Sequence, residues 1–273
     1  MLRSLAEPEG YRLEALDGDI GHCHDFLFDD ALWTLRYMVA DTGGWLSGRK
    51  VLISPAQLES PDWGRQRMPV NLTKAQIEQS PPLDGDAPVS RRYERLYNEV
   101  HSLPSYWLGS GLWGDFPIPA SLTPAQEARI EPNTRGAAVA DTELEPADLE
   151  EGDEVHLRSV REVTGYSVVG QRGADHGGGI DKVGRVVDLI VNDSSWALRA
   201  FVVDSSRLPF SKKVLLPVDA VAEIDWVSRQ VIADVAAERI EEAPAFDPSE
   251  PINERLETVL YDVYGRPAPR AEL

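Results

Sequence analysis

The sequence lacks most of the features that assign a chain to a well-known class of protein. Its single cysteine, Cys23, excludes a disulfide within the chain and is typical of a reducing compartment. No apolar run approaches the roughly 20 residues needed to span a bilayer. Acid and proline within the first ten residues are unlike a signal peptide. We therefore expect a soluble, cytoplasmic protein with no membrane span.

Positive charge is also scarce. The chain holds 27 Lys and Arg against 46 Asp and Glu, which gives a net charge of −19. Nucleic-acid binding rests on basic side chains that displace counterions from phosphates, so we expect no nucleic-acid partner. Nearly half of the imbalance lies in residues 108–156, which contain 11 acidic and 2 basic side chains. The composition of this stretch predicts an acidic, proline-rich linker.

Common catalytic and cofactor motifs are missing as well. The chain contains no G-x-S-x-G, H-E-x-x-H, P-loop or C-x-x-C pattern. Residues 109–114 match G-x-G-x-x-G in letters, but that phosphate-binding turn needs a strand before it and a helix after it. Aromatic residues precede it here and prolines follow it. We expect no cofactor, no catalytic residues and no enzymatic activity.

The sequence does contain an internal repeat. Residues 21–36 align with residues 184–199 at a shift of 163 positions, and the alignment continues without a gap to Pro104. Upstream, residues 2–4 and 157–159 both read Leu-Arg-Ser, but at a shift of only 155 positions. The second copy therefore carries an insertion of eight residues between Tyr166 and Gly184. Such self-similarity predicts two copies of one unit of roughly one hundred residues.

Within each copy the pattern predicts short strands. Apolar and other side chains alternate along residues 33–39, as in a half-buried strand, and residues 50–53 form another apolar run. Thr73 begins a capping-box pattern for a short helix. Amphipathic helices are predicted at residues 91–97 and 254–260. Several short strands without a long helix favour a small closed or partly closed barrel.

These residues carry a resemblance to a known family. Residues 2–55 contain Leu-Arg-Ser, Gly-Tyr, a Gly-x-x-x-Asp-Phe segment, Trp-x-x-Arg-Tyr, Asp-Thr-Gly-Gly-Trp-Leu and Lys-Val-Leu-Ile-Ser-Pro, and in that order they resemble the PRC-barrel family. The second copy resembles it through Gly184, Asp188, Asp193, Trp196, Arg199, Asp204, Val214 and Pro217. The family includes the cytoplasmic domain of the photosynthetic reaction-centre H subunit and the C-terminal domain of a ribosome maturation factor.

The resemblance implies a mainly β protein built of two SH3-like barrels in tandem, each followed by a short helix. The predicted boundaries are residues 1–107 for the first barrel and its helix, and 157–273 for the second. We name residues 106–116 the aromatic strap. Residues 108–156 would supply most of this strap and the acidic linker that follows it. The resemblance carries no catalytic residues.

Two sets of residues are candidates for binding. The strap residues either pack on a barrel or form a surface for a protein partner or for self-association, as a pseudo-dimer of barrels or a homodimer of chains. A second set recurs in both copies and either holds an anionic ligand or fixes the fold, the reading we favour. The strap candidates are Tyr106, Trp107, Leu112, Trp113 and Phe116, and the recurring set is Asp25/Asp188, Trp33/Trp196, Arg36/Arg199 and Asp41/Asp204.

His22 and His24 are weak metal candidates. They lie two apart, so on a strand they would point the same way, with Asp25 nearby to supply oxygen. The second copy has Arg185 and Val187 at these positions, so the barrel does not need the histidines. Two ligands also do not make a site, so we predict no metal.

The resemblance and the missing motifs together favour a protein-interaction adaptor or scaffold without turnover. The alternative is a small-ligand or metal-binding protein, including a hydrolase, built on the histidines or on the recurring Asp and Arg residues. Family analogy alone adds a role associated with a photosynthetic reaction centre or electron transport.

Overall fold

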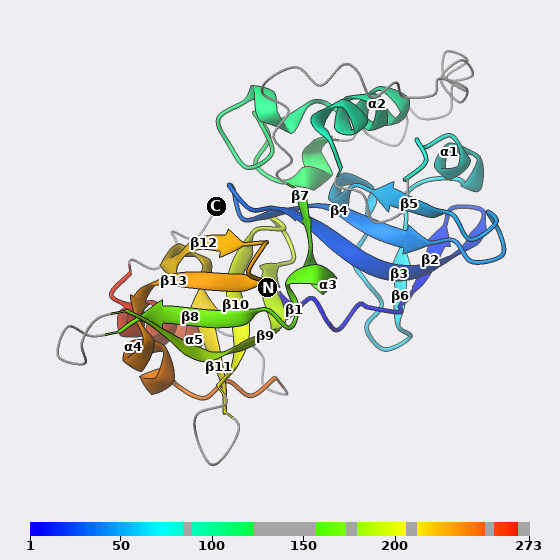
Figure 1. Cartoon of the computed structure of the whole chain (residues 1–273). Helices are drawn as coiled ribbons and strands as arrows, with labels where there is room; N and C mark the ends of the chain where they lie inside the picture. The colour runs from blue at the N-terminus through cyan, green and yellow to red at the C-terminus, as the bar shows by residue number, and fades with distance from the viewer. Residues whose placement is uncertain (84–88, 123–156, 173–178, 206–211, 249–253, 267–273) are drawn as a thin grey trace. The chain divides into compact units, whose positions relative to one another are not determined.

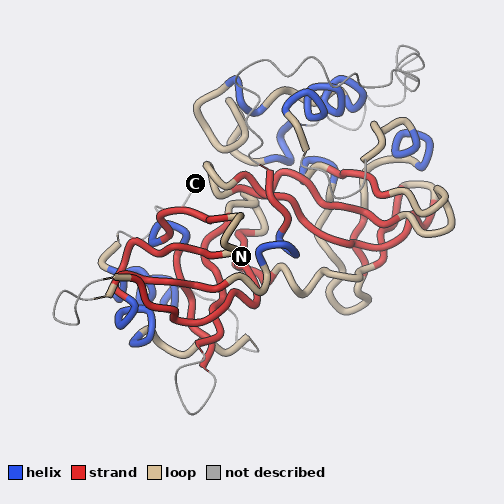
Figure 2. The backbone as a smooth tube through the Cα atoms, in the orientation of Figure 1, coloured by secondary structure: helices blue, strands red, loops and turns tan. Residues whose placement is uncertain are grey.

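A computed structural model describes residues 1–83, 89–122, 157–172, 179–205, 212–248 and 254–266. The chain forms two compact units, both built mainly of strands (Figures 1 and 2). We call the first the N-terminal unit; it comprises Pro8–Arg158 and Ser194–Trp196. The C-terminal unit comprises Met1–Glu7, Ser159–Asp193 and Ala197–Leu273. Each unit thus includes a short piece of chain from the other copy of the repeat.

The sheet of the N-terminal unit has the strand order β5-β4-β3-β2-β6, with β7 also paired to β3. Neighbouring strands are antiparallel except for β2 and β6, which are parallel. The hydrogen-bonded path does not close on itself among the described strands. The strands are β2 (Arg12–Ala15), β3 (Gly18–Asp29), β4 (Thr34–Asp41), β5 (Lys50–Ile53), β6 (Arg67–Pro69) and β7 (Leu157–Ser159).

The sheet of the C-terminal unit repeats this order as β11-β10-β9-β8-β13 and adds β12 beside β13, with β1 paired to β9. The parallel pair recurs between β8 and β13. The strands are β1 (Leu2–Ser4), β8 (Ser167–Gln171), β9 (Ile180–Asn192), β10 (Leu198–Ser205), β11 (Lys212–Pro217), β12 (Val221–Asp225) and β13 (Gln230–Ala236). The two Leu-Arg-Ser segments therefore play matching parts, since each adds a strand to the sheet of the other copy.

Irregularities in the two sheets also recur at a separation of 163 residues. The β3–β4 pairing slips between Leu27 and Phe28 and leaves Arg36 as an extra residue, and the β9–β10 pairing does the same at Arg199. A second bulge falls at His24 in β3 and at Val187 in β9. Because a bulge redirects the side chains around it, the strict alternation expected for His22 and His24 is interrupted.

Unusual backbone conformations match as well. Trp33 and Trp196 both adopt a left-handed conformation, with φ of 48° and 59°. Gly21 and Gly184 lie against the carbonyls of Asp41 and Asp204, where a Cβ atom would overlap the backbone. Only glycine fits such a close approach.

Short helices complete each unit. The capping box at Thr73 is confirmed, because its hydroxyl accepts from the backbone N–H of Gln76 and the Gln76 side chain accepts from the backbone N–H of Thr73. The two predicted amphipathic helices are confirmed and extend further than expected, as α2 and α5. The helical elements are η1 (Pro55–Gln57), α1 (Lys74–Glu78), α2 (Arg91–His101), η2 (Tyr106–Leu108), η3 (Pro119–Leu122), α3 (Val160–Val163), η7 (Val218–Ala220), α4 (Ala237–Glu242) and α5 (Glu254–Tyr264).

Helix α2 packs its apolar face on β4 and β5 (Figure 1). Tyr93 and Tyr97 on the helix join Tyr37, Val39 and Leu52 on the strands in one buried cluster. The Tyr97 hydroxyl also ties the helix to η1, directly after β5, since it donates to Gln57 Oε1 and accepts from the backbone N–H of Ser54. This is the docking of the trailing helix that the amphipathic pattern predicted.

The prediction that residues 33–39 form a half-buried strand is wrong in one respect. All residues of β4 up to Ala40 are buried, including Thr34 and Arg36 on the face expected to meet solvent. The aromatic strap accounts for the difference around Arg36, because its rings lie over this side chain. From residue 123 onward, the predicted acidic linker lies outside the described residues.

Candidate functional site

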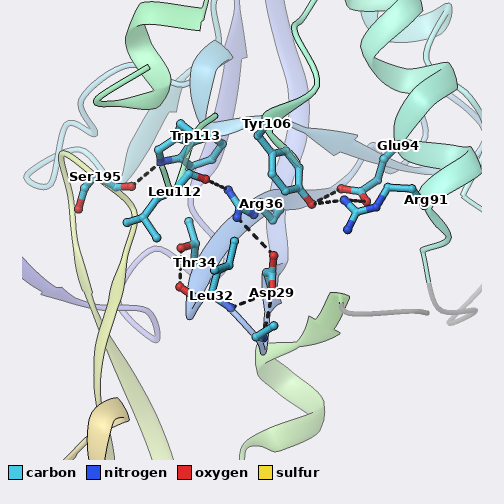
Figure 3. A network of polar contacts seen from close by, with 11 residues as sticks. Asp29, Leu32, Thr34, Arg36, Arg91, Glu94, Tyr106, Leu112, Trp113 and Ser195 are labelled. Atoms are coloured by element: carbon cyan, nitrogen blue, oxygen red, sulfur yellow. Dashed lines mark hydrogen bonds and ion pairs between the residues drawn. The ribbon is translucent and has the colours of Figure 1, made fainter. Parts of the chain in front are cut away.

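Arg36 lies at the centre of a buried polar network in the N-terminal unit (Figure 3). The bulge in β4 directs its guanidinium away from the regular ladder, and the residue is only 1% exposed. Arg36 Nη2 lies 3.3 Å from Asp29 Oδ2, while Nη1 donates to the carbonyl of Leu112 in the strap. Asp29 Oδ1 accepts from the backbone N–H groups of Ala31 and Leu32, which fixes the turn before β4. Both terminal nitrogens of this buried cation are thus hydrogen-bonded, whereas its Nε atom is buried without a partner among the described residues.

Two aromatic rings of the strap cover the same guanidinium. The Arg36 Cζ atom lies 3.7 Å from the ring centroid of Tyr106 and 5.0 Å from that of Trp113. Both distances are within the range of a cation–π interaction, which strengthens when water is excluded. Trp113 Nε1 in turn donates to the carbonyl of Ser195 at 2.7 Å. The strap is therefore held by its rings, by one of its carbonyls and by an indole N–H.

Glu94, on α2, links the strap to the helix. The Tyr106 hydroxyl donates to Glu94 Oε1 at 2.7 Å, and Arg91 Nη1 donates to Oε2 at 2.9 Å. Arg91 also donates to the Tyr106 hydroxyl at 2.9 Å, so the three side chains form a closed triangle. Burial raises the pKa of Glu94 to about 7, and the neighbouring Arg91 cation and the Tyr106 hydrogen bond oppose that rise.

A carboxyl group with a pKa near 7 could act as a general acid or base. In this network, however, each Glu94 oxygen already accepts a hydrogen bond, and both Glu94 and Tyr106 are buried. Neither group presents an atom to a substrate while the strap is in place. The arrangement anchors a loop to a sheet and a helix, which is the fold-fixing role favoured for the recurring arginine.

The structure divides the five predicted strap residues into two groups. Tyr106 and Trp113 are buried and serve as anchors, so they can meet a partner only if the strap leaves its place. Trp107 and Leu112 are partly buried, and Phe116 is exposed. The strap region also exposes two further apolar residues, Leu108, at 82%, and Ile118.

Ser80 and His101 form a pair that resembles a nucleophile and its base. Ser80 Oγ lies 2.8 Å from His101 Nε2. Burial lowers the pKa of His101 to about 4, so its imidazole is a weak base at neutral pH. Ser80 is itself buried, and no carboxylate in the described part of the chain orients the other ring nitrogen. The pair ties the end of α2 to the segment after α1 and lacks the parts of a catalytic triad.

The two metal candidates lie on the same strand. His22 is exposed and His24 is partly buried on β3, on either side of the buried Cys23. Within the described ranges no three His, Cys, Asp or Glu side chains lie close enough to hold a metal ion. Burial, with Asp25 and Glu9 adding to it, raises the pKa of the Cys23 thiol well above its usual range. The thiol is therefore held in its unreactive form.

Sequence reasoning identified Arg36 and the strap but missed their partners. Asp29 looked like a turn residue, and Glu94 was one polar position on an amphipathic helix. The only available signal for Glu94 was its recurrence as Glu257 in the second copy. Ser195 could not be found, because its backbone carbonyl binds Trp113 whatever its side chain is.

The chain was compared with known families and proteins. A sequence model of the PRC-barrel domain matches residues 156–240, which include most of the strands of the C-terminal unit. The family likeness is thus shown for the second copy, although the fuller set of motifs was found in the first. No curated protein matches the chain. Within the described residues, no helix combines the length and apolar character that a membrane crossing demands.

Proposed function

We propose that the chain is a tandem duplication of PRC-barrel units, each closing as an SH3-like barrel, and that it serves as a non-enzymatic adaptor or scaffold. The matching strand orders support the duplication, as do the shared bulges at Arg36 and Arg199 and the shared left-handed tryptophans. The PRC match in the second copy then extends to the first by internal likeness.

The observation that carries the interaction role is the strap region of the N-terminal unit. A network of buried charges and rings holds its inner side, while Leu108, Phe116 and Ile118 face solvent. Exposed apolar side chains on a rigid support are what a protein partner buries. The inward chemistry serves to hold the strap, and the outward apolar residues are available for contact.

The test uses the full chain as bait in a native lysate, with captured proteins quantified by mass spectrometry. The variant combines L108D, F116D and I118D, which place charge on the outer side of the strap region and leave its buried anchors intact. We expect one or more specific proteins to be lost at least tenfold from the variant, because a charge in an apolar interface is costly to desolvate. V227D supplies the control, because Val227 is an exposed apolar residue (96%) of the C-terminal unit.

Equal capture by the wild type and the triple variant would exclude the strap as the interaction surface. An absence of any specific protein in all three samples would count against the adaptor role itself. A cytoplasmic location remains a prediction from the sequence.

A further inference from the structure

Each unit holds a short strand that arrives from the other copy of the repeat. In the C-terminal unit β1 pairs antiparallel with β9, and Arg3 lies opposite Val191. In the N-terminal unit β7 pairs with β3. We name residues 2–4 and 157–159 the two arms, and the positions that they fill beside β9 and β3 the arm sites. Both arms read Leu-Arg-Ser, so two identical segments fill two equivalent sites.

An aspartate receives the arginine of each arm. Arg158 Nε lies 3.1 Å from Asp30 Oδ2. In the other unit Arg3 Nε lies 3.7 Å from Asp193 Oδ2, and the same aspartate also accepts from the amino group of Met1. Asp30 and Asp193 are equivalent positions, because they lie 163 residues apart. The same pairing of charges therefore recurs at both arm sites.

Asp188, one of the recurring aspartates, receives the end of the first arm. Its Oδ2 atom accepts from the Ser4 hydroxyl, and its Oδ1 atom accepts from the backbone N–H of Ala6 at 3.0 Å. The backbone N–H of Leu5 donates to the carbonyl of Leu189 at 3.0 Å, and the Leu5 side chain is buried. Backbone pairing, a charge pair and carboxylate hydrogen bonds thus hold a segment of only a few residues.

We propose that the arm sites accept the arms of a second copy of the chain, which gives a dimer with exchanged arms. Neither site takes the arm of its own copy of the repeat, because each arm already comes from the opposite copy. The contacts described above would therefore form in the same way if the two copies lay on two chains. This interaction goes beyond the proposed adaptor function, since it uses the arms and not the strap.

The chemistry of the sites favours a second copy over a different protein. Each site offers an aspartate to the arginine of an arm, and Asp188 offers a carboxylate to the serine. A second copy carries two segments with these side chains in the right order. The net charge of −19 makes two chains repel each other, so an association between them must rest on specific contacts such as these.

The test mixes two full-length variants. The arm variant, R3E with R158E, reverses the charge of both arms, and the site variant, D30R with D193R, reverses the charge of both arm sites. Each variant alone places like charges at its sites, whereas exchanged arms in a mixed dimer bring opposite charges together at every site. We expect mixing to raise the amount of two-chain species, measured by sedimentation velocity, at least about tenfold over either variant alone. The matched control carries all four substitutions in one chain, which restores opposite charges internally, and it should behave as the wild type.

Cysteine cross-linking shows which chain supplies the arm. Leu2 and Asn192 lie opposite each other in the pairing of β1 with β9. In an oxidised mixture of the two charge variants, L2C in the site variant and N192C in the arm variant should join the two chains through a disulfide, because the exchange brings these positions together. V227C in place of N192C is the control, since Val227 is an exposed residue of the same unit. The melting temperature of each variant shows whether its units remain folded.

Folded variants that remain single chains on mixing would overturn the exchange. Equal association of each variant alone and of the mixture would overturn it too, because the charges at the arm sites would then have no influence. Adding L108D, F116D and I118D to both variants separates this proposal from the proposed function. Two-chain species that persist would support the arms as the contact, whereas their loss would assign the association to the strap and overturn the exchange. Failure of the exchange leaves the lysate prediction for the strap unchanged.

Discussion

The raised pKa of Glu94 makes the stability of the N-terminal unit depend on pH. Its ordinary pKa of 4.5 rises to about 7 in the folded chain, chiefly through burial. Between these values the folded state binds more protons than the unfolded state, so the free energy of unfolding falls as pH rises. The difference corresponds to about 3 kcal/mol, fully present below pH 4.5 and lost by about pH 7. E94Q should remove this part of the pH dependence.

The assay has two readouts. Carboxyl ¹³C NMR follows the titration of Glu94 directly, and urea unfolding at several pH values follows the free energy. The indole N–H signal of Trp113 reports on the strap, which matters because two units can unfold in separate transitions. E99Q is the matched control, since Glu99 is an exposed acid on the same helix.

Two neighbours of Glu94 lower its pKa, so substituting either one should raise it. The Arg91 cation lowers this pKa, so R91M should raise it above about 7. Y106F removes a hydrogen bond to the carboxylate and should shift it in the same direction. If Glu94 titrates near 4.5, or if R91M lowers its pKa, the buried network described here is incorrect.

Three further predictions follow from single contacts. G21A should destabilise the N-terminal unit by more than about 1 kcal/mol in urea unfolding, because a Cβ atom at this position overlaps the Asp41 carbonyl. G44A is the control and should be near neutral, because the space around Gly44 is open. Equal effects of the two substitutions would contradict the close approach at Gly21. W113F should cost at least about 1 kcal/mol, because it removes the hydrogen bond to Ser195 and part of a buried ring, and an unchanged midpoint would contradict this packing. Cys23 should resist a thiol reagent until urea unfolds the chain, so rapid labelling of the native protein would disprove its burial.

The sequence predicted most of the local structure because local signals produce it. The repeat placed matching strands 163 residues apart, the Thr73 capping box identified α1, and the amphipathic patterns identified α2 and α5. It also singled out Arg36 and Tyr106. It misjudged the burial of β4, because alternation along a strand says nothing about what covers its outer face.

Tertiary structure decided how these parts are used. Pairing of Leu-Arg-Ser segments with the opposite copy joins residues more than a hundred positions apart, which no local pattern encodes. Arg36 is paired with Asp29 and covered by the rings of Tyr106 and Trp113, which lie about seventy positions further along the chain. Its burial therefore depends on whether distant groups reach the guanidinium. The sequence alone determined the repeated β units and their helices, and only the folded chain decided that the strap covers Arg36, because no local pattern encodes a contact between distant segments.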